Sequence, residues 1–168
     1  MRGILMGAVL FMVATAAIAQ GPGAMSAQTM KTFASSADVA AMMDKAKKER
    51  KPDQANYSQR ILQLAPYNVN LEYRALVGPS SVHETEAEIF YVVDGSATLV
   101  TGGKLTGETR NNPTNLSGTG IDGGTTQKIA KGDFIIIPEK VPHWFSPING
   151  LLVVMSLHVP RPLPEATH

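Results

Sequence analysis

The last two thirds of the chain consist of short apolar runs separated by turn signals, which is the pattern of an all-β domain. Gly78-Pro79 and Lys131-Gly132 are typical of turns, and Asp94-Gly95 and Asn149-Gly150 favour two-residue hairpins. This spacing predicts a single antiparallel sandwich or barrel over residues 58–160. The expected strands are residues 61–64, 69–77, 88–93, 97–101, 127–130, 134–137, 143–146 and 151–159.

The segment before these runs has helical periodicity. Ser36 resembles an N-cap, Asp38 lies in the first turn and apolar residues follow at helical spacing, which predicts a helix and its connection over residues 36–57. Residues 20–35 are rich in small residues without a sustained period, so we expect a flexible leader there. Residues 161–168 are expected to be a tail.

A glycine-rich segment interrupts the strand pattern. Residues 102–125 contain seven glycines, repeated Asn and Thr, and almost no large apolar side chain. The composition predicts an insert loop outside the core. A loop of this length in a compact domain is usually functional or disordered, so a lid over the site and a disordered segment are both open interpretations.

The first nineteen residues have the three parts of an export signal. Arg2 supplies a positive charge, residues 4–13 form an apolar run, and Ala17-Ile18-Ala19 provides the small residues that a signal peptidase accepts. The apolar run is shorter than the roughly 20 residues that a membrane-spanning helix needs. We therefore expect cleavage after Ala19 and a periplasmic or secreted protein, with no membrane association after cleavage.

Charge and cysteine content narrow the partners and the kind of site. Removing residues 1–19 removes one positive charge, so 14 Lys and Arg balance 14 Asp and Glu. A mature domain of zero net charge gives no reason to expect nucleic acid as a partner. The chain has no cysteine, so a metal site requires His and carboxylate ligands. We expect a small-molecule ligand or substrate, and a homodimer is left open.

Two histidines and a glutamate lie in strand-rich, glycine-punctuated segments and are candidate metal ligands. They are His83, Glu88 and His143. Neutral imidazole and carboxylate suit Mn, Fe, Co, Ni or Zn, and three protein ligands leave positions open for water or a substrate. Strand alternation puts Glu88 on the face of Phe90 and Val92, where an unpaired carboxylate is costly. The alternative is a hydrogen-bonded cluster of the same side chains without a metal.

The first of these segments resembles the first motif of the cupin superfamily. That motif has His-x-His, three or four residues, Glu, six residues and Gly, and His83, Glu88 and Gly95 fit its second part. Ser81 stands where the family has its first histidine, which removes one expected ligand. Another alignment places His83 at the first histidine of the motif and Thr85 at the second, but it leaves only two residues between Thr85 and Glu88.

The second segment resembles the second cupin motif, which has Gly, five residues, Pro-x-Gly, two residues and His. Gly132, Pro138 and His143 fit, while Lys140 replaces the last glycine. The resemblance covers about residues 60–160. It implies a jelly-roll β-barrel of cupin type around a mononuclear divalent metal, although cupins that have lost the metal are also known.

The resemblance implies either of two functions. One is an exported metal-dependent enzyme with oxygenase, isomerase or lyase chemistry, and the other is a non-catalytic cupin that binds a small ligand or a metal. An enzyme needs an acid or base besides its ligands, and Tyr73, Glu86 and Ser81 are the candidates. Glu86 is also a spare ligand because it shares the parity of Glu88. His158 is expected on an edge strand outside the site.

Overall fold

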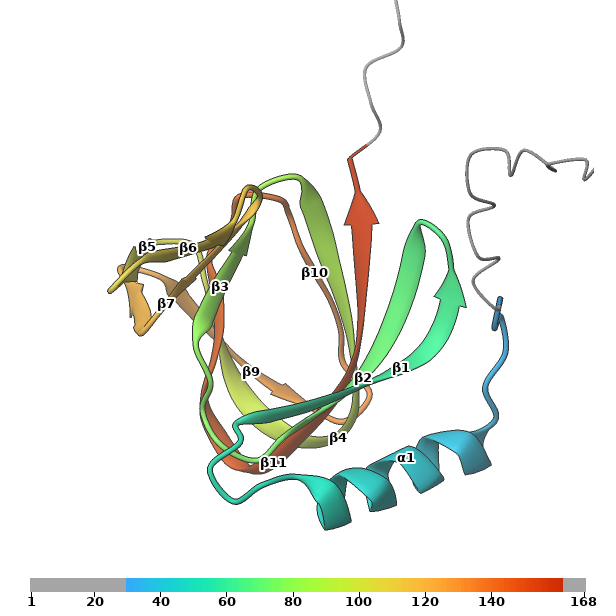
Figure 1. The fold of residues 1–168 in the computed structure, drawn as a ribbon. Helices are drawn as coiled ribbons and strands as arrows, with labels where there is room; N and C mark the ends of the chain where they lie inside the picture. The colour runs from blue at the N-terminus through green and yellow to red at the C-terminus, as the bar shows by residue number, and fades with distance from the viewer. Residues whose placement is uncertain (1–29, 162–168) are drawn as a thin grey trace, which may run out of the picture.

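Two long strands, β4 (Glu86–Thr101) and β11 (His143–Pro160), run antiparallel to each other along most of their lengths and organise the domain (Figure 1). The computed structural model describes residues 30–161. The export signal expected in residues 1–19, the leader before residue 30 and the tail after residue 161 lie outside the described residues.

The other main strands extend the sheet from the edges of β4 and β11. They are β1 (Asn56–Leu64), β2 (Tyr67–Arg74), β3 (Ser80–His83), β9 (Thr125–Ala130) and β10 (Phe134–Ile137). β2 follows β11 and carries β1 on its other edge, while β9 and β10 pair with different parts of β4 and β3 pairs with β11. All of these pairings are antiparallel, and the curved strands wrap around an interior (Figure 1). The predicted antiparallel jelly-roll fold is therefore confirmed.

Apolar side chains at alternate positions of β4 and β11 fill this interior. Phe90 and Val92 of β4 and Phe145 and Val154 of β11 are all 3% exposed or less. The rings of Phe90 and Phe145 meet edge to face with their centroids 5.1 Å apart. Burial of each such side chain stabilises the fold by about 1.5–3 kcal/mol. Because Glu88 shares the parity of Phe90 and Val92, the same alternation carries its carboxylate into the interior.

The two hairpins predicted at Asp94-Gly95 and Asn149-Gly150 are not present, because both pairs lie inside the continuous strands β4 and β11. Residues 149–151 face Ser96 alone, so the extra residues form a bulge rather than a turn. Gly95 has a φ of +80°, and a Cβ at this position would collide with the backbone oxygen of Leu151. Glycine marks a close approach of two strands here, and turn propensity misidentified it.

The segment 102–125, predicted as an insert loop, contains four short strands. They are β5 (Lys104–Thr106), β6 (Thr109–Asn112), β7 (Asn115–Gly118) and β8 (Gly120–Asp122). Their glycine-rich turns and lack of large apolar residues conceal the strand pattern in the sequence. β7 pairs with β3, which places Asn115 directly opposite His83. The segment is therefore part of the domain and reaches the candidate site.

The predicted N-terminal helix is confirmed as α1 (Ser36–Glu49), which lies outside the strands near β1 and β2 (Figure 1). Its N-cap is Ser35, one residue earlier than predicted. The Ser35 hydroxyl accepts from the backbone N–H of Asp38, and the Asp38 carboxylate accepts from the backbone N–H of Ser35. Within residues 30–161, no helix is long and apolar enough to cross a membrane.

Candidate metal centre

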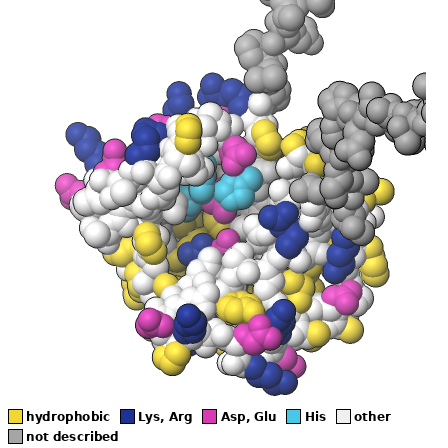
Figure 2. Space-filling model, viewed as in Figure 1, with side chains coloured by type: hydrophobic (Ala, Val, Ile, Leu, Met, Phe, Trp, Pro, Cys, Tyr) yellow, Lys and Arg dark blue, Asp and Glu magenta, His cyan; other side chains and the backbone are white. Residues whose placement is uncertain are grey.

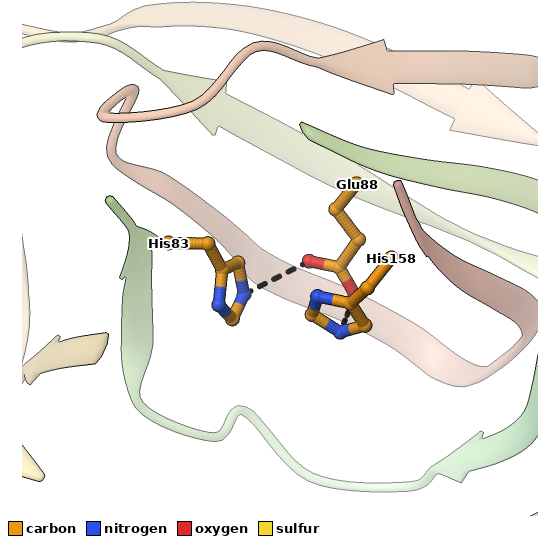
Figure 3. Close-up of side chains that lie close together, drawn as sticks. All are labelled: His83, Glu88 and His158. Atoms are coloured by element: carbon orange, nitrogen blue, oxygen red, sulfur yellow. Dashed lines mark ion pairs between the residues drawn. The ribbon is translucent and has the colours of Figure 1, made fainter. Parts of the chain in front are cut away.

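Three histidines surround the carboxylate of Glu88, and the strand pairing explains how they meet. His83 is the last residue of β3, His143 is the first residue of β11, and His158 lies near the other end of β11. His158 is the direct partner of Glu88 in the ladder between β11 and β4, while His143 pairs with Ser81 of β3. Figure 3 shows His83 and His158 approaching the carboxylate from two sides.

The Nε2 atoms of all three rings converge on this carboxylate. Nε2 of His83 lies 3.1 Å from Oε2 of Glu88, and Nε2 of His143 lies 3.2 Å from the same oxygen. Nε2 of His158 lies 3.3 Å from the other oxygen, Oε1. Glu88 is 4% exposed and His143 is 5% exposed, so water contributes little to their solvation.

The opposite edges of two of these rings face oxygen acceptors. Nδ1 of His83 lies 2.5 Å from Oδ1 of Asn115, and Nδ1 of His143 lies 3.3 Å from the backbone oxygen of Val141. The amide nitrogen of Asn115 donates to Asn112, which fixes the amide with its oxygen toward His83. Each Nδ1 must therefore carry a hydrogen, and in a neutral ring Nε2 then presents a lone pair to Glu88.

Two imidazole lone pairs and a carboxylate oxygen repel one another, so this arrangement requires a positive charge among these atoms. Additional protons on the rings provide one solution. A divalent cation bound by the Nε2 atoms and the carboxylate provides the other, and it satisfies every one of these groups at once. The donor set of imidazole nitrogen and carboxylate oxygen is the set that Mn, Fe, Co, Ni and Zn accept in proteins.

The electrostatics of the cluster favour positive charge. Burial by itself would raise the pKa of Glu88, but the bonds from His143, His158 and His83 hold that pKa well below its usual range. Burial opposes protonation of His83, yet its hydrogen bond to Glu88 raises its pKa. The bond to Glu88 also raises the pKa of His158 against the effect of burial. The field that retains protons here also attracts a metal cation.

The spacing of the ligand atoms fits a metal. His83, Glu88 and His158 each offer one ligand atom, and these three atoms all lie within 4.8 Å of one another. Ligand atoms held at about 2.0–2.2 Å from one cation are roughly 3–4 Å apart, so little movement is needed to bind it. His143 lies outside this group, but its Nε2 atom is 3.2 Å from Oε2 of Glu88, so it is the third imidazole beside the carboxylate.

Glu86 lies beside the cluster. Its Oε2 atom is 3.1 Å from Nδ1 of His158, at the ring edge opposite Glu88. The pair is close but not aligned as a hydrogen bond, and Nδ1 of His158 has no hydrogen-bond partner among the described residues although it is buried. Glu86 is partly exposed, with 35% of its side chain accessible, so its carboxylate reaches both the cluster and solvent.

The structure brings the three predicted ligands His83, Glu88 and His143 together. Ser81 pairs with His143 and shares the parity of His83, so its side chain is directed toward the same face of β3. The structure does not bring Tyr73 to the cluster. Glu72 accepts a hydrogen bond from the buried Ser156, so its side chain faces the interior. Strand alternation therefore turns the next residue, Tyr73, to the opposite face of β2.

His158 is the residue that the sequence analysis missed, because it was expected on an edge strand outside the site. β11 is flanked by β2 and β4, so it is an interior strand. A signal was present in the sequence: His158 shares the parity of Val154 and Ser156, which are both completely buried. The position of His158 near the end of the chain suggested an edge strand instead.

A polar pocket of about 390 Å³ opens beside the cluster. Figure 2 shows histidine side chains in a hollow of the surface, with acidic and basic side chains nearby. The volume lies within the range of small-molecule sites, and the lining is mostly polar. The lining residues are Arg60, Pro66, Asn68, Asn70, His83, Glu86, Asn115 and His158.

The family model of the cupins matches residues 50–162, more than half of the chain, and the protein therefore belongs to the cupin family. A comparison with curated proteins finds no match. Solved structures with similar folds have low sequence identity to this chain. A Klebsiella pneumoniae protein with a double-stranded β-helix domain is 15% identical, with 66% of this chain and 82% of that chain aligned and a TM-score of 0.47.

Two further structures have comparable scores. The cupin domain of Schizosaccharomyces pombe Cnp3 is 9% identical, with 68% of this chain and 72% of that chain aligned and a TM-score of 0.46. The iron(II) form of HppE is 12% identical, with 62% of this chain and 51% of that chain aligned and a TM-score of 0.48.

Proposed function

We propose that this cupin is a metal-dependent enzyme that acts on a small polar molecule. Its centre holds one divalent transition metal through His83, Glu88, His143 and His158. The observation that carries the proposal is the convergence of three Nε2 atoms on one buried carboxylate. The chemical class is that of an oxygenase, an isomerase or a lyase, and the identity of the metal is among Mn, Fe, Co, Ni and Zn.

A bound divalent metal would polarise a carbonyl or hydroxyl oxygen of the substrate and make a neighbouring proton easier to remove. The residues of this chain prepare that chemistry. Asn115 orients the ring of His83, and the backbone oxygen of Val141 orients His143. The polar pocket provides access to the cluster from one side.

Glu86 is the proposed general base. Its carboxylate lines the polar pocket beside His83 and His158, where it can accept a proton from a substrate bound at the centre. A non-catalytic binding protein would not need this group, so Glu86 favours an enzyme over the alternative of a protein that only binds a small ligand or metal. Tyr73 is not proposed for this role because it faces away from the cavity.

Export remains a proposal that rests on the sequence of residues 1–19. We propose the same division of the chain as before: a signal peptide over 1–19, a leader over 20–35, the helix and its connection over 36–57, the barrel over 58–160 and a tail over 161–168. Under this proposal the enzyme works in the periplasm or outside the cell, on a small molecule and without a nucleic acid or membrane partner.

Turnover by the metal-loaded protein tests the proposed function. Oxygen uptake and product formation are measured with small enediols and with small hydroxy and oxo acids after loading with each candidate metal. Glu86→Gln should retain metal but lower turnover by at least about 100-fold, since general-base catalysis contributes about 100-fold or more. Glu84→Gln is the matched control, because Glu84 binds Arg110 on the surface. Equal turnover in both variants would contradict the role of Glu86.

A further inference from the structure

Arg60 forms no ion pair with a carboxylate of the described residues, unlike Arg74, Arg110 and Arg161. Its Nε atom donates to Oδ1 of Asn70 at 2.9 Å, and its Nη1 atom donates to Oδ1 of Asn68 at 2.5 Å. Both acceptors are neutral amides. Among the described residues, no Asp or Glu oxygen lies within 4.0 Å of Arg60, whereas Arg74 and Arg110 each form such an ion pair.

These contacts orient the guanidinium without cancelling its charge. Arg60 and Asn70 are direct partners in the ladder between β1 and β2, so the bond between them follows from the strand register. The two bonds engage Nε and Nη1, and the Nη2 hydrogens have no hydrogen-bond partner within residues 30–161. A held, unneutralised guanidinium is suited to bind an oxygen anion, because less side-chain freedom is lost when the ligand arrives.

Arg60 lines the same polar pocket as the metal centre. The pocket also contains His83, His158 and Glu86, so one small molecule in it meets both the guanidinium and the cluster. Asn70 pairs with Ser156 of β11, which lies two residues before His158. Strand β1 is therefore two strands away from β11, about 10 Å, and a long Arg side chain reaches across much of that distance.

We propose that the substrate is a small monocarboxylate with a hydroxyl or oxo group, and that Arg60 binds its carboxylate while the second oxygen reaches the metal centre. The assignment rests on the proposed function, because the second oxygen requires a metal. A divalent metal and Arg60 carry three positive charges, and Glu86 and Glu88 carry two negative charges. The remaining single positive charge complements a monoanion better than a doubly charged phosphate.

Isothermal titration of the zinc-loaded protein tests this assignment with two pairs of probes. Lactate is compared with lactamide, and 3-hydroxybutyrate with 3-hydroxybutyramide, so that each pair differs in charge but hardly in shape. The expected result is a preference for the acid over the amide that falls by about tenfold or more in Arg60→Gln, because a charge-assisted hydrogen bond is lost. Arg60→Lys should restore part of the preference, and the control Arg110→Gln should leave it unchanged.

Zinc content measured on the same samples separates this proposal from the proposed function. If zinc binds but Arg60→Gln leaves the preference for both acids intact, the assignment of Arg60 is overturned while the metal centre stands. Tighter binding of inorganic phosphate than of either acid would overturn the monocarboxylate class. If no zinc binds, the proposed function fails, and so does the contact between the second oxygen of the substrate and the metal. Arg60-dependent binding of the acids alone would still support the carboxylate site.

Discussion

His158 and Glu88 face each other directly across the ladder between β11 and β4, with Nε2 of the histidine 3.3 Å from Oε1 of the carboxylate. The family motif lacks its first histidine here, since Ser81 occupies that position. His158 reaches the same carboxylate from a different strand. The proposed centre therefore keeps three imidazoles although one residue of the motif is absent.

The contribution of His158 predicts a specific loss and a specific rescue. His158→Ala should weaken metal binding by more than about tenfold, because one of four ligands is removed. Ser81→His in that background should restore much of the affinity, since Ser81 pairs with His143 and shares the parity of His83. Competition with a chromogenic chelator measures both effects. Unchanged affinity in His158→Ala would exclude this residue from the centre.

Asn115 is predicted to support the centre without binding the metal. Its Oδ1 atom accepts from Nδ1 of His83, and such partners of ligating histidines contribute about 10–100-fold to metal affinity. Asn115→Leu should lower metal affinity within that range, in addition to a loss of about 1–3 kcal/mol in the stability of the metal-free protein from the unpaired Nδ1–H of His83. The matched control is Asn149→Leu, because Asn149 bonds Ser96 at an exposed position and does not line the pocket beside the cluster. Equal affinities in the two variants would contradict the role of Asn115.

The stability of the metal-free protein should depend on pH in a defined direction. Burial opposes the protonation of His83, but its bond to Glu88 raises its pKa above the ordinary 6.5. A separate bond from His158 to the same carboxylate raises the pKa of His158. Their contribution is fully present below about pH 6.5 and is lost as pH rises through the raised values. The pKa of Glu88 is lowered below 4.5, so its contribution is lost as pH falls further.

We therefore expect the metal-free protein to be more stable to urea at about pH 5.5 than at about pH 8. Saturating zinc should reverse this order, because protons compete with the metal for the same nitrogens. Glu88→Gln should flatten the dependence in the metal-free protein, since it removes the charge that raises both histidine pKa values. A metal-free protein that is more stable at pH 8, with the same dependence in Glu88→Gln, would contradict this account.

The close approach of β4 and β11 at Gly95 predicts a large effect on stability. Gly95→Ala should lower the free energy of unfolding by about 3 kcal/mol or more, because its Cβ would collide with Leu151 and its φ is +80°. Gly132→Ala is the control: its φ is +95°, but no atom lies within 4 Å of the added Cβ. It should cost only about 1–2 kcal/mol. Equal losses in urea unfolding would show that the collision does not matter.

Local sequence patterns were sufficient for the strand class and the helix. Together with the cupin resemblance, they singled out His83, Glu88 and His143, which lie together in the fold. Alternation of apolar and polar residues is a property of one strand, so it also predicted the burial of Glu88. The patterns failed where two distant strands meet. Gly95 looks like a turn residue until β11 is placed against it. Whether a carboxylate neutralises Arg60 likewise depends on which residues of β2 lie beside it.

His158 shows the same limit within the site. It follows Glu88 by seventy residues, and only the register between β4 and β11 makes the two residues neighbours. Asn115 likewise reaches His83 through the pairing of β7 with β3, in a segment whose composition suggested a loop. Ladder register is a tertiary property, so neither contact could be read from local periodicity.

Metal content is the most direct test of the central claim that four side chains form a metal centre. The protein is expressed in medium supplemented with each candidate metal, purified and dialysed. Its metal content per chain is then measured beside that of Glu88→Gln and of the control Glu84→Gln. The account predicts about one divalent metal per chain in the wild type and the control, and at least about tenfold less metal binding in Glu88→Gln. A wild-type protein without metal after supplementation, or equal metal in Glu88→Gln, would contradict it.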